Sequence, residues 1–278
     1  MIDGFEVVFW FHKKKLYLCS LKGTKSIDMP TKINILMQSL PRSSVLLLSW
    51  LLSQGYSYEL QKRYRKSGWL KSIGKGAMLL SRDSLVLAGA LSTLQNVENL
   101  NAHIGGRSAL ELHGFAHYLQ INSYVATLFV NGRTKLPLWF TNNEWDTKTI
   151  VYRLSLFEDE TVGMVDYQQG ELTMKISSPA RAIMECLALC PKKFQLQEAY
   201  EIMEALGTMR PVKVQELLEN CKSVKVKRLF LYFAEKANHS WFKHLKVEKI
   251  DLGAGNRTLG EGGFYDSKYK LNLPKNIV

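Results

Sequence analysis

The densest group of chemically active side chains lies between Ser57 and Lys75, where six basic residues face a single acid, Glu59. The basic residues are Lys62, Arg63, Arg65, Lys66, Lys71 and Lys75. Ammonium and guanidinium groups bind phosphate oxygens, and a cluster of them attracts a polyanion over long range. The segment therefore predicts a binding surface for a polyanion such as a nucleic acid.

Two helices are expected ahead of this segment. The pattern over Lys32–Leu40 is helical, and Pro41 ends it because the proline ring disfavours helix at the preceding residue. Ser43 or Ser44 can then cap a second helix over Val45–Leu52, which is apolar enough to be buried.

The basic segment itself is predicted to begin as a third helix. Gly55 ends the second helix, because glycine adopts left-handed geometry readily. Ser57 can cap the next helix, which runs to about Ser67 and carries Glu59 in its first turn, where negative charge complements the helix dipole. Two helices joined by so short a turn resemble a helix-turn-helix.

Periodicity predicts which way the third helix faces. At 100° per residue, the side expected to pack inward holds Leu60, Tyr64 and Ser67. The outward side holds Tyr58, Lys62, Arg65 and Lys66, and the opposite margins hold Gln61 and Arg63. An outward cationic face is what a helix lying in the DNA major groove requires.

Two short apolar runs follow, Trp69–Ile73 and Ala77–Leu80, separated by the turn Gly74–Gly76. They predict a hairpin with Lys71 on its first strand and Lys75 at its tip. A basic hairpin directly after a helix-turn-helix is a wing. The order of turn, basic helix and basic hairpin predicts a winged helix that binds double-stranded DNA, although a basic helix face alone is more often solvated surface.

Each basic or polar side chain of this surface has an expected role. Base-edge or groove contacts are assigned to Tyr58, Gln61, Lys62 and Arg65. Phosphate contacts are assigned to Arg63, Lys66, Lys71 and Lys75.

The whole chain has 278 residues, enough for about two domains at roughly 150 residues each. Its 37 Lys and Arg against 25 Asp and Glu give a net charge of +12, and residues 29–101 supply half of that excess. We expect an extension without assigned function at 1–28, a winged helix-turn-helix domain at 29–98 and a larger mixed domain at 99–278. The predicted fold class is α+β.

The number of cysteines and the length of the apolar runs indicate the cellular compartment of the protein. Four cysteines are too few and too irregular for a disulfide framework, which favours a reducing compartment. The longest apolar runs fall far short of a membrane helix of about 20 residues. A cytoplasmic location is expected.

Residues 99–278 show no strong catalytic pattern. Structural roles are expected for Cys186 and Cys190, which share a face of an apolar helix, and for Gly105 and Gly106, which allow close packing ahead of a helix. The alternative function is a metal-dependent nuclease, with Asp251 and Asp266 as metal ligands and Lys268 as the activating lysine. Acidic residues on the helix that carries Glu198 are read as a solvated face, with docking of a protein partner as the minor alternative.

Seven short motifs together resemble those of one protein family. In chain order the motifs are Leu40-Pro41, Gly55-Tyr56, Tyr64 to Leu70 and Gly74-Lys75-Gly76, then Gly105 to Gly114, Ser178 to Arg181 and Leu252 to Arg257. Over roughly Met29 to Pro274 the chain resembles the AbiEi-type antitoxins of type IV toxin-antitoxin (abortive infection) systems. It departs from them at residues 1–28, which have no counterpart, and at Ala77-Met78, where an aromatic residue commonly stands.

The resemblance implies a bacterial two-domain antitoxin used in phage defence. Its first domain would bind inverted repeats at its own promoter as a repressor, and its second would counteract a cognate nucleotidyltransferase-like toxin. It implies no catalysis, no cofactor and no metal site.

Overall fold

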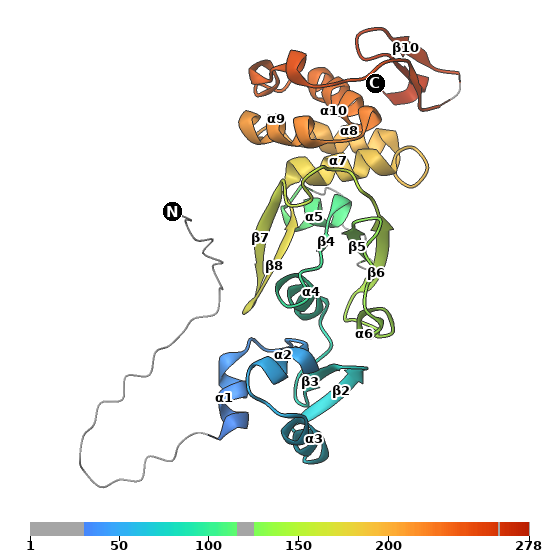
Figure 1. Ribbon diagram of the computed structural model, residues 1–278. Helices are drawn as coiled ribbons and strands as arrows, with labels where there is room; N and C mark the ends of the chain where they lie inside the picture. Colours follow the sequence, from blue (N-terminus) through green and yellow to red (C-terminus); the bar gives the residue numbers. More distant parts are fainter. Residues whose placement is uncertain (1–30, 116–124, 261, 278) are drawn as a thin grey trace, which may run out of the picture.

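The computed structural model describes residues 31–115, 125–260 and 262–277. The extension predicted at residues 1–28 lies outside them. The described chain forms an elongated molecule, with an N-terminal unit at one end, a mixed sheet in the middle and a group of helices at the other end (Figure 1). Among the described residues, no helix is long and apolar enough to cross a membrane.

The N-terminal unit combines three helices with a small sheet. In chain order its elements are α1 (Lys32–Ser39), β1 (Leu46–Leu47), α2 (Leu48–Ser53), α3 (Tyr58–Lys66), β2 (Leu70–Gly74) and β3 (Ala77–Leu80). The strands pair antiparallel in the order β1-β3-β2. Leu36, Leu51 and Tyr64 from the three helices pack on Leu70 and Met78 of the sheet.

The predicted start of the second helix was wrong by three residues. Val45 to Leu47 do not continue a helix, because Leu46 and Leu47 pair with Met78 and Ala77 of β3. Ser43 has a left-handed φ of 62°, and its backbone N–H donates to Asp83 Oδ2 at 2.8 Å, so neither this serine nor Ser44 caps the helix. Tertiary pairing has overridden the local capping signal.

The third helix and the hairpin follow the predicted boundaries closely. Ser57 Oγ accepts a hydrogen bond from Leu60 N at 3.3 Å, and Gly55 before it has a φ of +81°. In the hairpin, Gly74 pairs with Ala77, and Gly76 takes the left-handed φ of +78° that glycine adopts without a Cβ penalty.

Helix α4 (Leu87–Asn96) lies between the N-terminal unit and the rest of the chain (Figure 1). Thr93 Oγ1 donates to Val45 O at 3.0 Å on one side. On the other side Gln95 Nε2 donates to Lys175 O at 2.9 Å, and Gln95 Oε1 accepts from Lys175 N at 2.7 Å. Because α4 is bonded to both sides, it couples them mechanically.

The central sheet has the strand order β6-β5-β4-β8-β7. Its strands are β4 (Ala102–Ile104), β5 (Val125–Val130), β6 (Lys148–Arg153), β7 (Met164–Gln169) and β8 (Leu172–Ser177). The pairs β4·β8 and β5·β6 are parallel, whereas β4·β5 and β7·β8 are antiparallel. Three helices belong to this region: α5 (Gly106–Leu112), the short α6 (Leu138–Thr141) and α7 (Pro179–Leu189).

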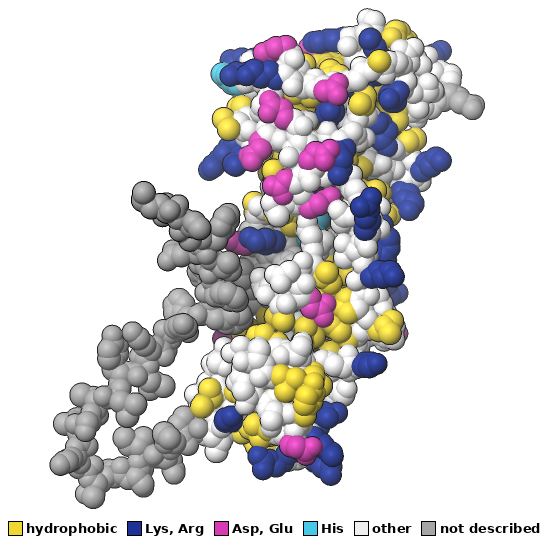
Figure 2. All heavy atoms as spheres, in the orientation of Figure 1, with side chains coloured by type: hydrophobic (Ala, Val, Ile, Leu, Met, Phe, Trp, Pro, Cys, Tyr) yellow, Lys and Arg dark blue, Asp and Glu magenta, His cyan; other side chains and the backbone are white. Residues whose placement is uncertain are grey.

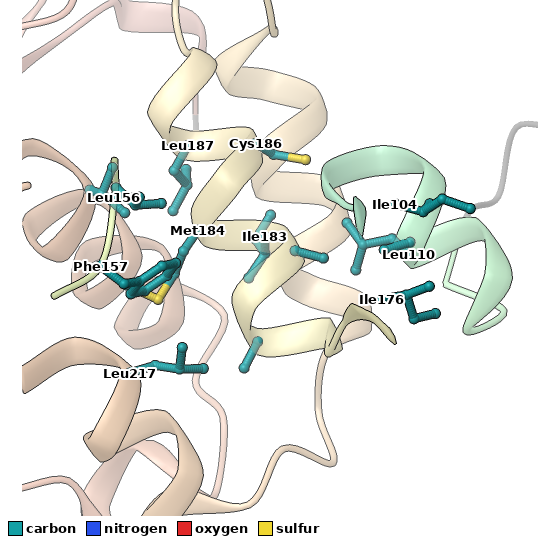
Figure 3. Close-up of a cluster of buried hydrophobic side chains, with 14 of the residues drawn as sticks. Ile104, Leu110, Leu156, Phe157, Ile176, Ile183, Met184, Cys186, Leu187 and Leu217 are labelled. Atoms are coloured by element: carbon teal, nitrogen blue, oxygen red, sulfur yellow. The ribbon is translucent and has the colours of Figure 1, made fainter. Parts of the chain in front are cut away.

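The remaining helices pack on α7. They are α8 (Leu196–Ala205), α9 (Pro211–Asn220) and α10 (Val224–Lys236). Ile183, Met184 and Leu187 of α7 point into a cluster that includes Leu110 of α5 and Leu217 of α9 (Figure 3). The chain ends in a small sheet of order β10-β11-β9, built from β9 (Arg257–Thr258), β10 (Phe264–Asp266) and β11 (Leu271–Leu273), with short 3-10 turns at Phe242–His244, Val247–Lys249 and Lys275–Ile277.

The predicted α+β class is confirmed. The apolar periodicity of the sequence predicts helices over 107–113, 179–189, 196–206, 212–220 and 224–237, and each is present within about one residue at each end. The strands β4, β9 and β10 and the single turn of α6 were not predicted, because elements of two to four residues carry too few positions to show a period. Strand β7 was also not predicted; it is six residues long, and half of them are exposed.

Candidate nucleic-acid interface

Helix α3 turns one face into the N-terminal unit and the other into solvent. Tyr64 is buried, while Lys62, Arg63, Arg65 and Lys66 are all exposed. Among the described residues, no salt bridge engages any of these four cations. Lys and Arg side chains gather at the tip of this end of the molecule, beside an acidic side chain (Figure 2). Four positive charges are thus held on one short helix without an internal counter-ion.

Tyr58 opens the exposed face of α3. It is the first residue of the helix, and its side chain is 59% exposed. An aromatic ring with a hydroxyl at a helix N-terminus can stack, donate and accept, which suits a contact with a base edge.

Gln61, placed at a margin of α3 and assigned a base-edge contact, is instead buried, so this assignment was wrong. Gln61 is 1% exposed, and its Nε2 donates to Tyr56 O at 2.7 Å, which ties α3 to the preceding turn. Its Oε1 has no hydrogen-bond partner among the described residues. Gln61 is drawn inward because the preceding turn offers its amide a carbonyl acceptor, which helical periodicity does not reveal.

Replacing Gln61 by Met should therefore lower stability without changing DNA binding. The Tyr56 carbonyl would lose a buried donor, so we expect a loss of about 1–2 kcal/mol in the free energy of unfolding by urea. The exposed Gln54→Met is the control and should stay within about 0.5 kcal/mol. A change of DNA sequence preference in Gln61→Met, with stability unchanged, would restore the original assignment.

The two lysines of the hairpin differ in their surroundings. Lys75 lies exposed at the tip between β2 and β3. Lys71 Nζ instead donates to Asp83 O at 2.5 Å. Lys71 is therefore held toward Asp83 by one of its three N–H donors, and because the side chain is exposed the other two stay open to a phosphate.

A groove beside α3 was not predicted from the sequence. The groove has a volume of about 1020 Å³ and lies between α1 and α3, where Lys32, Lys62, Arg63 and Lys66 contribute to its lining. Trp69 also lines it and is 39% exposed, so an aromatic ring lies in the same groove as the four cations. Lys32 lies outside the cationic run, so no local signal in the sequence connects it with α3.

A buried carboxylate joins α7 to β4 and the start of α5. Glu185 of α7 is 2% exposed. Its oxygens accept hydrogen bonds from Arg181 Nε at 2.9 Å, Ser177 Oγ at 2.8 Å and Gly106 N at 2.8 Å. Nε2 of His103 lies 3.0 Å from Oε1 of the same carboxylate. Burial by itself raises the pKa of Glu185. The His103 imidazole and the Arg181 guanidinium, with their hydrogen bonds, outweigh that effect and lower the pKa to about 2.

This carboxylate accounts for the Gly105-Gly106 pair. A Cβ on Gly105 would lie 2.2 Å from Glu185 Oε2, so only glycine permits the approach. The interpretation of the pair as a close-packing device is confirmed. The N-terminus of α5 receives its negative charge from within the chain.

The residues of the nuclease alternative are each engaged locally. Asp251 Oδ1 accepts from Gly253 N at 2.8 Å, Asp266 Oδ1 accepts from Tyr269 N at 2.7 Å, and Lys268 forms a salt bridge with Glu235. The described part of the chain contains no group of three or more His, Cys, Asp or Glu side chains that could hold a metal ion. This arrangement offers the nuclease hypothesis no support.

Cys186 and Cys190 are buried. Burial raises the pKa of the Cys190 thiol to about 12, so it stays protonated and unreactive at neutral pH. Of the acidic side chains on α8, Glu198 forms a salt bridge with Arg107 at 3.0 Å. Acidic residues nevertheless gather on the surface of this helical region (Figure 2).

Comparison with known proteins places these features in a class. A family described as a transcriptional regulator, AbiEi antitoxin of type IV toxin-antitoxin systems, matches residues 123–274. The N-terminal domain of AbiEi antitoxin, also described as a transcriptional regulator, matches residues 29–121. The α+β chain with its basic N-terminal unit is thus of the transcriptional-regulator antitoxin class. It belongs to the AbiEi antitoxin family, as the sequence motifs indicated.

One solved structure supports the fold. The chain is similar to the crystal structure of the RV2827C protein from Mycobacterium tuberculosis, with a TM-score of 0.51 and 13% identity over 86% of this chain and 88% of that chain. No curated protein is significantly similar to the chain in sequence.

Proposed function

We propose that this protein is a DNA-binding repressor of its own operon and the antitoxin of a type IV toxin-antitoxin system. The observation that carries the DNA-binding part is the exposed face of α3, which presents Lys62, Arg63, Arg65 and Lys66 without internal ion pairs in the described chain. Free cations on a solvated helix keep their full attraction for phosphate.

The N-terminal unit at 29–98 then acts as a winged helix-turn-helix. Helix α3 lies in the major groove, where Tyr58, Lys62 and Arg65 contact base edges. Arg63 and Lys66 hold phosphates beside the groove, and Lys75 at the hairpin tip holds the backbone further along the duplex. Lys71, which uses one N–H on Asp83 O, can join them with its other two donors.

The antitoxin part rests on family membership. The domain at 99–278 counteracts a cognate nucleotidyltransferase-like toxin, and the protein recognises inverted repeats at its promoter. Reading the frame adjacent to this gene tests the pairing directly, since a nucleotidyltransferase-like frame is expected there.

The salt dependence of binding tests the DNA contact. With about five phosphates neutralised, log K should fall against log salt concentration with a slope of about −4.5. Fluorescence anisotropy of a labelled promoter duplex across a salt series measures this slope. An affinity that does not change with salt would contradict an interface built on lysines and arginines.

A further inference from the structure

The sheet of the N-terminal unit is covered on both faces. Leu46, Leu70, Met78 and Leu80 belong to the core formed with α1, α2 and α3. The alternate residues Val45, Leu47, Ala77 and Leu79 belong instead to the main core, together with Leu87, Ala88 and Leu91 of α4 and with Trp139 of α6. The hairpin therefore packs on one face against the helices of the N-terminal unit and on the other against the main core.

The hairpin tip also contacts α6. A Cβ on Gly74 would lie 3.1 Å from both Cα and Cβ of Trp139, so the two backbones approach closely. Asn143, just beyond α6, donates from Nδ2 to Ile73 O at 2.6 Å and to Trp139 O at 2.6 Å. One amide group thus joins the strand that leads into the tip to the helix of the second domain.

Helix α6 is itself fixed in place. Trp139 is 4% exposed, and its Nε1 donates to Glu98 Oε1 at 3.1 Å. Trp145 packs edge-on against Trp139, with ring centroids 6.3 Å apart. Asp146 Oδ1 accepts from Leu87 N at 2.8 Å, which bonds the segment after α6 to the start of α4. The support behind the hairpin is rigid enough to set its direction.

We propose that Asn143 is a positioning residue for DNA binding: by bonding Ile73 it holds the hairpin at the angle to α3 that lets Lys75 meet the phosphate backbone. This inference rests on the proposed function for its DNA readout, and adds that the second domain sets the geometry of the interface through a residue that does not touch DNA. Lys75 remains exposed while the opposite side of the hairpin is held.

The first experiment measures promoter affinity and salt slope for Asn143→Ala, Lys75→Ala and the double variant. Asn143→Ala should bind about fivefold more weakly at about 0.15 M salt and show a slope smaller by about 0.9, the effect of losing one phosphate contact. The double variant should bind no more weakly than Lys75→Ala alone, because Asn143 acts through Lys75. The control is Asn142→Ala, an exposed neighbour of the same type, which should match the unmodified protein.

A second experiment needs no DNA. Limited trypsin digestion followed by mass spectrometry measures the rate of cleavage after Lys75, and this rate should rise in Asn143→Ala but not in Asn142→Ala. Gly74→Ala tests the contact from the hairpin side and should also raise the rate, which keeps the proposal testable if Asn143→Ala folds poorly.

Each outcome is decisive. Unchanged affinity and unchanged cleavage in Asn143→Ala would overturn the proposal, and so would additive losses in the double variant. If the unmodified protein binds no DNA while cleavage still rises, the hairpin is held as described and it is the proposed function that fails.

Discussion

Reversing two charges on α3, Lys62→Glu with Arg65→Glu, is expected to weaken promoter binding by more than about 100-fold. Each lost contact costs about fivefold at about 0.15 M salt from counterion release alone, and the two new carboxylates repel the phosphates. Both side chains are exposed and unpaired among the described residues, so the melting temperature should change little. Gel-shift titration and circular dichroism melting curves measure the two quantities.

The matched control changes net charge by the same amount on another helix. Arg210→Glu with Lys213→Glu alters exposed residues at the start of α9, far along the chain from α3. This variant should lose little affinity. Equal losses in the two pairs would mean that binding follows net charge alone, and unchanged binding in the α3 pair would refute the placement of the interface.

Replacing Glu185 by Gln is expected to lower the free energy of unfolding by about 3–5 kcal/mol, because it leaves Arg181 and His103 buried without their carboxylate. Urea unfolding at pH 7 measures this loss. Glu158→Gln is the control, since the Glu158 side chain is 72% exposed and lies 3.9 Å from Lys222, so a change within about 0.5 kcal/mol is expected.

The stability difference between the unmodified protein and Glu185→Gln is expected to depend on pH. The folded pKa of Glu185, about 2, lies below its ordinary value of 4.5, so its stabilisation is complete above pH 4.5 and disappears as the pH falls through 2. The difference in stability between the unmodified protein and Glu185→Gln should therefore shrink by about 3 kcal/mol between pH 5 and pH 2. A difference that is constant over this range would contradict the assignment of Glu185 as a buried ionised group.

Local signals were sufficient to predict the basic helix and hairpin. Ser57 and Gly55 act on backbone groups within a few residues of themselves, so α3 begins where they indicate. The start of α2 could not be found in this way, because Val45 to Leu47 are extended only by virtue of pairing with β3 some thirty residues later. A helix-capping residue acts only on nearby backbone groups, so it does not indicate whether the segment pairs with a distant strand.

The exposed cations of α3 were predicted from the sequence, whereas the contacts that other residues make beside them were not. Periodicity placed Lys62, Arg65 and Lys66 outward, and they are exposed. Gln61 is buried instead, because its amide donates to the Tyr56 carbonyl in the preceding turn. The contact of Asn143 with Ile73 joins residues 70 positions apart, and no pattern within either segment indicates it. The domain boundary at 98/99 stays a prediction, although α4 bonds to both parts.

A lysine acetylation footprint, with and without saturating promoter DNA, tests most directly whether duplex DNA lies on α3 and the hairpin. DNA should protect Lys62, Lys66 and Lys75 from the reagent while Lys213 on α9 reacts as before. If Lys62, Lys66 and Lys75 react equally fast in the complex, the duplex does not lie on α3 and the hairpin, and the account is contradicted.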